Sequence, residues 1–212
     1  MTETAATYTA FIGHRCLGSG GLEALVRAIK TAQEQGDKNA VLIFDDDSKP
    51  VEVDLRGSLG AVLKRLPAAP AIEAAPEKSG RGRPKLGVVA REVTLLPRHW
   101  EWLNQQPGGA SVALRKLVEE ARRLHLPRDR ARRSQESAYR FMAAMAGNLP
   151  DYEEALRAFY AGNKRRFNSL VATWPDGVRD HAKQLAGRAF VDAAAVETAA
   201  VDTADAKQKT PG

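Results

Sequence analysis

The 212-residue sequence contains a single cysteine, Cys16, and no long hydrophobic run. One cysteine excludes an internal disulfide framework and a metal site built from several cysteines. No apolar run approaches the ~20 residues that cross a bilayer, so we expect no membrane segment. The first residues, MTETAATYTAF, lack the basic start and apolar stretch of a signal peptide. These absences predict a soluble protein of the reducing cytoplasm.

The composition is that of an ordinary globular protein. Apolar residues make up 43% of the chain and charged residues 27%, which excludes wholesale disorder and fibrous structure. A chain of 212 residues is long enough to bury a core in one or two domains.

The excess of positive charge is concentrated in one segment. The chain has 32 Lys and Arg against 26 Asp and Glu, a net charge of +6. Residues 79–133 hold 13 basic and 5 acidic residues, whereas residues 1–78 hold 9 and 11, and residues 134–212 hold 10 and 10. Concentrated positive charge favours a nucleic-acid partner, and the alternative is a solvated basic face.

Hydrophobic periodicity predicts an α+β protein whose N-terminal part is a small α/β module, residues 1–66. The run 8–15 is typical of a strand, and 22–35 has apolar residues at helical spacing. Residues 40–55 resemble a hairpin with arms VLIF and VEVDL, and 57–66 a short helix. The expected order of this module is therefore β-α-β-β-α.

Composition divides the rest of the chain. Residues 67–82 are rich in proline and alanine, which predicts a flexible linker before a middle unit at 83–126. Residues 127–190 have the apolar spacing of helices, and the alanine-rich residues 191–212 are expected to be a disordered tail.

The middle unit begins with a short segment of alternating character, REVTL (91–95). Val93 and Leu95 would lie on one face of a strand, and Glu92 and Thr94 on the other. Because a lone strand leaves its backbone groups unpaired, we expect it to pair with its twin from a second chain.

Two helices are expected after this strand. Pro97 suits the first position of a helix, and Ser111 is a plausible N-cap for the next one. The second helix has an apolar stripe of period 3.6, formed by Leu114, Leu117, Val118 and Ala121.

The strand, the GGAS turn and the LRKLVEEA helix, together about residues 90–123, resemble the ribbon-helix-helix DNA-binding fold. The resemblance implies a homodimer whose two-stranded ribbon lies in the DNA major groove, with Glu92 and Thr94 facing base edges. It also implies that the helix N-terminus near Ser111 holds a phosphate, with charge added by Arg115 and Lys116.

A second motif lies just upstream, RGRPK (81–85), which resembles the core of an AT-hook. The resemblance implies that Arg81 and Arg83 lie along an A·T-rich minor groove, with Lys85 near a phosphate. The alternative is a basic solvated linker. The DNA-contacting residues predicted from both motifs are Arg81, Arg83, Lys85, Arg91, Glu92, Thr94, Ser111, Arg115 and Lys116.

Signs of an enzyme are weak. His14 and Cys16 lie two residues apart without an evident third group to orient them. Three carboxylates at 45–47 have the chemistry of a cation site, but in a DDDS sequence they more often cap a turn. We therefore expect no catalytic residue, no metal and no cofactor.

The run GRPKLGVVAREVTLLPRHWEWL with GGAS, and the opening YTAFIGHR, resemble a bacterial family of uncharacterised proteins, a domain of unknown function. Together the patterns predict a dimeric, non-enzymatic DNA-binding protein, a transcriptional regulator. Residues 1–66 would contact an unidentified ligand or protein. The alternative is a dimerisation or protein-interaction module without specific DNA binding.

Overall fold

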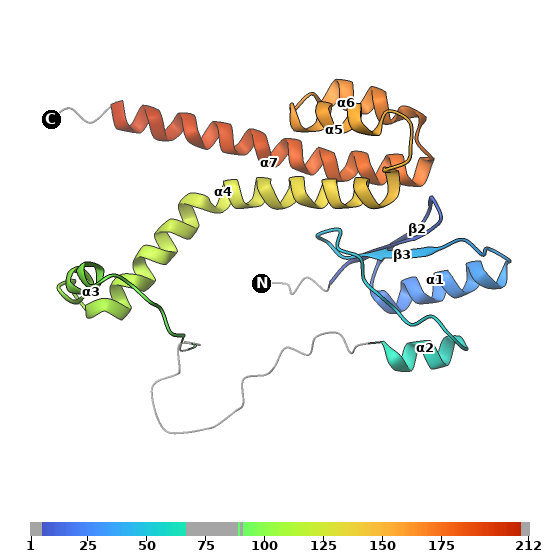
Figure 1. Ribbon diagram of the computed structural model, residues 1–212, viewed down its shortest axis with the longest axis horizontal. Helices are drawn as coiled ribbons and strands as arrows, with labels where there is room; N and C mark the ends of the chain where they lie inside the picture. Colours follow the sequence, from blue (N-terminus) through green and yellow to red (C-terminus); the bar gives the residue numbers. More distant parts are fainter. Residues whose placement is uncertain (1–5, 67–88, 90, 209–212) are drawn as a thin grey trace. The chain divides into compact units, whose positions relative to one another are not determined.

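The computed structural model describes residues 6–66, 89 and 91–208 and divides the chain into two units. Met1–Ala69 with Pro127–Gly212 form unit 1, and Pro70–Leu126 forms unit 2. The elements labelled in Figure 1 are β1 (Tyr8–Ile12), β2 (Arg15–Gly20), α1 (Leu22–Glu34), β3 (Val41–Phe44), α2 (Leu59–Arg65), α3 (Pro97–Asn104), α4 (Gly109–Ala146), α5 (Tyr152–Tyr160), α6 (Lys164–Leu170), η1 (Val171–Thr173) and α7 (Asp176–Gln208). The predicted α+β class is confirmed.

Unit 1 is built around an antiparallel sheet of order β2-β1-β3. The central strand β1 is buried on both faces because its side chains alternate. Ala10 and Ile12 face a core formed with α1, whereas Phe11 joins a second core with α4 and α7. Helices therefore cover both faces of the sheet, as Figure 1 shows.

Helix α1 covers the first face because its apolar residues recur at helical spacing. Leu25, Val26, Ile29 and Ala32 are all buried. The helix expected at 22–35 is confirmed almost to the residue.

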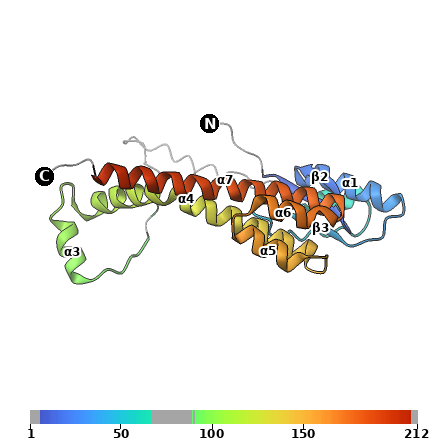
Figure 2. The same ribbon diagram turned by 90° about the horizontal axis from the view of Figure 1, so that it is seen from above.

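The larger core lies on the other face of the sheet. The part of α4 after Pro127 runs beside α7, as Figures 1 and 2 both show. The carboxylate of Asp192 on α7 joins the two helices by accepting from Arg130 Nε at 2.8 Å and from the Ser134 hydroxyl. Phe141 on α4 packs against Phe11 and Phe44 of the sheet, and Trp174 is buried in the same core.

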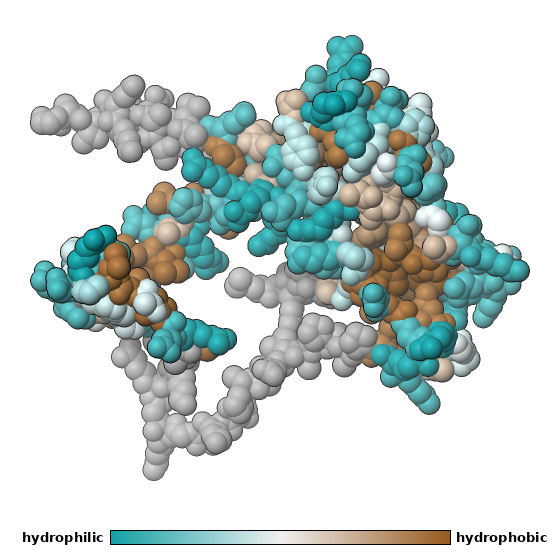
Figure 3. Space-filling view, viewed as in Figure 1, coloured by the Kyte–Doolittle hydropathy of each residue, from teal (hydrophilic) through white to brown (hydrophobic). Residues whose placement is uncertain are grey.

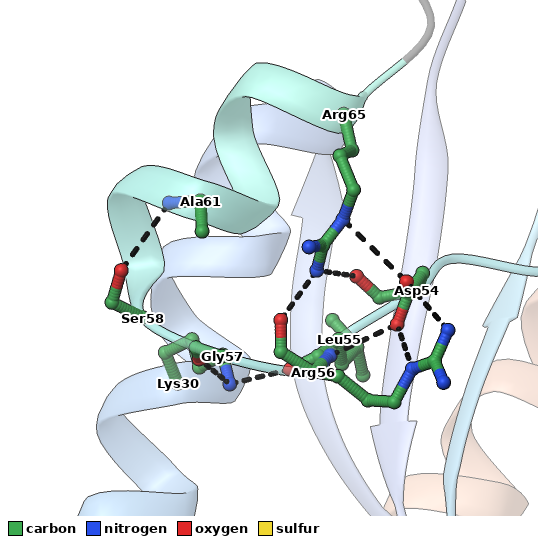
Figure 4. Close-up of polar contacts among 8 residues, drawn as sticks. All are labelled: Lys30, Asp54, Leu55, Arg56, Gly57, Ser58, Ala61 and Arg65. Atoms are coloured by element: carbon green, nitrogen blue, oxygen red, sulfur yellow. Dashed lines mark hydrogen bonds and ion pairs between the residues drawn. The ribbon is translucent and has the colours of Figure 1, made fainter.

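A polar network fastens the segment before α2 to α1 (Figure 4). Lys30 Nζ donates to the carbonyl oxygens of Leu55 at 2.6 Å and Gly57 at 2.9 Å. Hydrogen bonds from the Arg56 side chain and backbone hold the pKa of the Asp54 carboxyl well below its usual range. The charged side chains of this network thus have their partners within the same module.

The order of elements in residues 1–66 is β-β-α-β-α, not the expected β-α-β-β-α. The second strand is the glycine-containing β2, an edge strand where Gly18 and Gly20 have positive φ of 138° and 158°. VEVDL is not a strand: after the Phe44–Pro50 bridge only Val51 N–H reaches the sheet. Proline has no N–H to continue the ladder.

The C-terminal helix is longer than its sequence pattern predicts. α7 begins after Pro175, as expected, but continues to Gln208. It thus covers residues 191–208 of the segment for which the sequence predicts disorder. Helix α4 is also continuous through Pro127, where the division between the two units falls.

Candidate nucleic-acid interface

The described part of unit 2 consists of residues 89 and 91–96, which are neither helix nor strand, the short helix α3 and the first part of α4. Pro97 occupies the first turn of α3, where its missing N–H costs no hydrogen bond. Gly108 and Gly109, with φ of +86° and +75°, then turn the chain into α4. Only glycine adopts these angles without strain, so the PGG sequence fixes where the two helices separate.

The strand expected at 91–95 does not form within a single chain. Residues 91–96 have neither strand nor helix structure, and the described part of unit 2 contains no strand. Val93 is 54% exposed and Leu96 50% exposed. Pairing of this segment between two chains stays a prediction.

The described residues of the predicted DNA contact all have exposed side chains. They are Arg91, Glu92, Thr94, Ser111, Arg115 and Lys116. Ser111 is not the expected N-cap, because α4 already begins at Gly109 and places it in the first turn. The AT-hook-like residues, Arg81, Arg83 and Lys85, lie outside the described residues.

Several cations of unit 2 are left without a partner among the described residues. The side chains of Arg91, Arg98, Lys116 and Arg123 form neither an ion pair nor a hydrogen bond there, and all four are exposed. Sequence reasoning missed Arg98. Its position on the side of α3 opposite Trp100 and Leu103 is a signal that would have found it. These charges are available to a polyanion.

An apolar hollow of about 280 Å³ lies beside α3 and α4 within unit 2. Figure 3 shows hydrophobic residues gathered over α3 and the adjoining part of α4. Among the described residues of this unit only Leu103 and Ala113 are fully buried, whereas Trp102 is half exposed. The hollow is lined by Leu95, His99, Trp102, Leu103, Leu114 and Leu117.

The other candidates from the sequence lie in unit 1. The Asp45 carboxylate accepts from the backbone N–H of Asp47 at 2.9 Å and of Lys49 at 2.8 Å, as in the turn-capping interpretation. The side chain of His14 is exposed and that of Cys16 half-buried. Across the described residues, no three His, Cys, Asp or Glu side chains are placed to hold a metal.

His181 on α7 has a strongly shifted pKa. Burial against the rings of Phe11 and Phe141, with a smaller contribution from the charge of Arg188, lowers its pKa from 6.5 to about 4. The imidazole is therefore neutral at pH 7.

We expect unfolding to become easier between pH 6.5 and 4. In this range the unfolded chain binds a proton at His181 and the folded chain does not, so stability falls with falling pH. The two pKa values correspond to at most about 3 kcal/mol, reduced because the ring is not fully buried. Urea unfolding at several pH values tests this. His181→Phe should flatten the profile, and an unchanged profile would contradict the assignment.

The fold thus defines an α+β protein whose second unit carries a basic surface and an apolar hollow. The chain belongs to the family described as "Uncharacterized protein conserved in bacteria" (DUF2239), whose model matches residues 7–186. No curated protein and no solved structure matches the chain. No helix in the described part is long and apolar enough to cross a membrane.

Proposed function

We propose that the protein is a dimeric, non-enzymatic DNA-binding protein that regulates transcription. The observation that carries the proposal is a group of exposed cations in the segment that holds the excess positive charge. The side chains of Arg91, Arg98, Lys116 and Arg123 have no partner among the described residues. Such charges release counterions from the phosphate backbone when they bind it. The proposal includes no chemical reaction on the DNA.

A second copy of the chain would complete the proposed DNA-binding surface. Residues 91–95 of two chains would pair as an antiparallel ribbon, which a B-DNA major groove admits. The same pairing would cover Val93 and Leu96 and close the hollow beside Trp102, all exposed in one chain. A ribbon formed in this way presents Glu92 and Thr94 to the base edges.

The basic arm at 81–85 would extend the contact into the minor groove. Arg81 and Arg83 flank a glycine that lets the backbone approach the groove floor, where A·T-rich DNA has its most negative potential. Lys85, Arg115 and Lys116 would add phosphate contacts. Major-groove readout and a minor-groove arm would then act on the same site.

The half-exposed Trp102 beside the apolar hollow favours a second candidate function, a protein-interaction or dimerisation module. Large exposed apolar patches mark surfaces that bind other proteins. This module would not bind DNA with a steep dependence on salt. Both candidates predict a dimer, so the oligomeric state does not separate them.

We expect fluorescence-anisotropy titrations to show binding to short duplexes that weakens steeply with salt. In Arg81→Ala/Arg83→Ala, loss of two phosphate or groove contacts per chain should lower the salt slope by about 2 per chain. Titrating A·T-rich and mixed-sequence duplexes at low and physiological salt, with competitor DNA, measures both affinity and preference.

The matched control is Arg27→Ala/Arg157→Ala, which removes the same charge from two exposed residues of unit 1 paired with glutamates. The control should leave the salt slope unchanged. Absence of binding even at low salt would overturn the DNA proposal and favour the interaction module. Equal losses in both variants would mean that net charge, not the arm, drives binding.

A further inference from the structure

A second, polar hollow of about 90 Å³ lies within unit 1, between the sheet and α7. Its walls come from parts of the chain far apart in sequence: Thr9 on β1, Asp45 and Asp46 after β3, and His181, Gln184 and Arg188 on α7. A few tens of cubic ångströms already hold a water molecule. This hollow therefore has room for several waters or for a compact organic ligand.

One wall of the hollow carries two carboxylates that have no counterion among the residues that the structure describes. Asp45 uses its Oδ1 for two turn N–H groups, and Asp46 accepts a backbone N–H from Thr7 at 3.4 Å. Neither carboxylate forms an ion pair with a described cation, whereas the neighbouring Asp47 pairs with Lys49. The wall is thus suited to a cationic group that brings its own hydrogen-bond donors.

The opposite wall is supplied by α7. The side chain of Arg188 forms no hydrogen bond or ion pair with the described residues, although its charge acts on His181. His181 is neutral at pH 7 and so presents one donor and one acceptor, and Gln184 adds an amide. A guanidinium in this setting is suited to a carboxylate, which it can bind through two parallel hydrogen bonds.

We propose that this hollow binds a small zwitterion of the amino-acid class, with its ammonium group toward Asp45 and Asp46 and its carboxylate toward Arg188. The proposal combines opposite charges on two walls with a volume that admits only a compact molecule. It does not depend on DNA binding, because every residue involved lies in unit 1. A bound ligand would join the sheet to α7.

Isothermal titration calorimetry of the full chain with glycine, L-alanine and L-serine tests the proposal. We expect saturable binding of at least one of them with a millimolar or tighter Kd. Arg188→Gln and Asp46→Asn should each weaken binding about tenfold or more, since each removes a hydrogen bond between charged groups. Sodium acetate and methylammonium chloride, each with one of the two charges, should bind more weakly.

The matched controls are Lys183→Gln, on α7 but outside the hollow, and Asp47→Asn, next to Asp46 in the turn. Both should bind as the unchanged chain does. No binding of any of the three amino acids overturns the proposal. The proposal is also overturned if neither Arg188→Gln nor Asp46→Asn weakens binding. The same holds if acetate or methylammonium binds as tightly as an amino acid. DNA titrations of the same variants keep the two proposals separate.

Discussion

Gly177→Ala should destabilise the protein by about 3 kcal/mol, although alanine is the better helix former. Gly177 lies in the first turn of α7, and a Cβ there would meet the backbone N of Cys16 and O of His14 at 2.6 Å. Because both contacts are backbone atoms, the helix or the β1–β2 turn must move. Urea unfolding followed by circular dichroism measures the loss.

Gly187→Ala is the matched control on the same helix. A Cβ at this position meets nothing within 4 Å, so the change should be neutral or stabilise by up to about 1 kcal/mol through helix propensity. If the two substitutions had similar effects on the free energy of unfolding, α7 would not pack against the β1–β2 turn as described. Opposite signs would confirm the close approach.

Trp174→Ala should cost about 3–5 kcal/mol of unfolding free energy. Trp174 is 2% exposed and has the largest side chain of the core. Its indole Nε1 also donates to the carbonyl oxygen of Pro150 at 2.8 Å, which fixes the turn before α5. The substitution therefore leaves both a cavity and an acceptor without its donor.

Trp174→Phe separates the two contributions. Phenylalanine retains most of the packing but not the N–H, so we expect about half the loss or less, roughly 1–2 kcal/mol. Both variants are measured by denaturant unfolding under the same conditions. A loss below about 1 kcal/mol for Trp174→Ala would contradict a central role of this residue in the core.

Local periodicity was enough to predict the helices with a strong apolar stripe. The helix at 22–35, the start of α3 at Pro97 and the opening of α7 after Pro175 follow from apolar spacing and from the position of proline. These signals are local because helix hydrogen bonds join residues four apart.

Strand pairing was predicted less well, because it depends on partners distant in sequence. The glycine-rich β2 pairs only because β1 lies beside it, whereas VEVDL has the better strand composition and forms no strand. The segment 91–95 also pairs with no strand of the described part of its own chain. A strand-like pattern in the sequence therefore identified candidate strands but not the strands with which they pair.

The candidate sites show the same division. The basic segment and its exposed arginines were predicted from the sequence, because charge is a property of each residue and remains at the surface. The hollow of unit 1 was not predicted. Its lining residues come together only when α7 packs on the sheet, among them Asp45, Asp46, His181 and Arg188. His181 is neutral for the same reason, since its burial is a tertiary contact.

The sequence by itself determined the α+β class, the helices of strong periodicity and the position of the excess positive charge, all of which depend on residues close along the chain. Only the tertiary structure decided the strand order β2-β1-β3, the close approach at Gly177 and the polar hollow. Each of these brings together residues far apart in sequence, and packing of side chains between distant elements selects the pairs that meet.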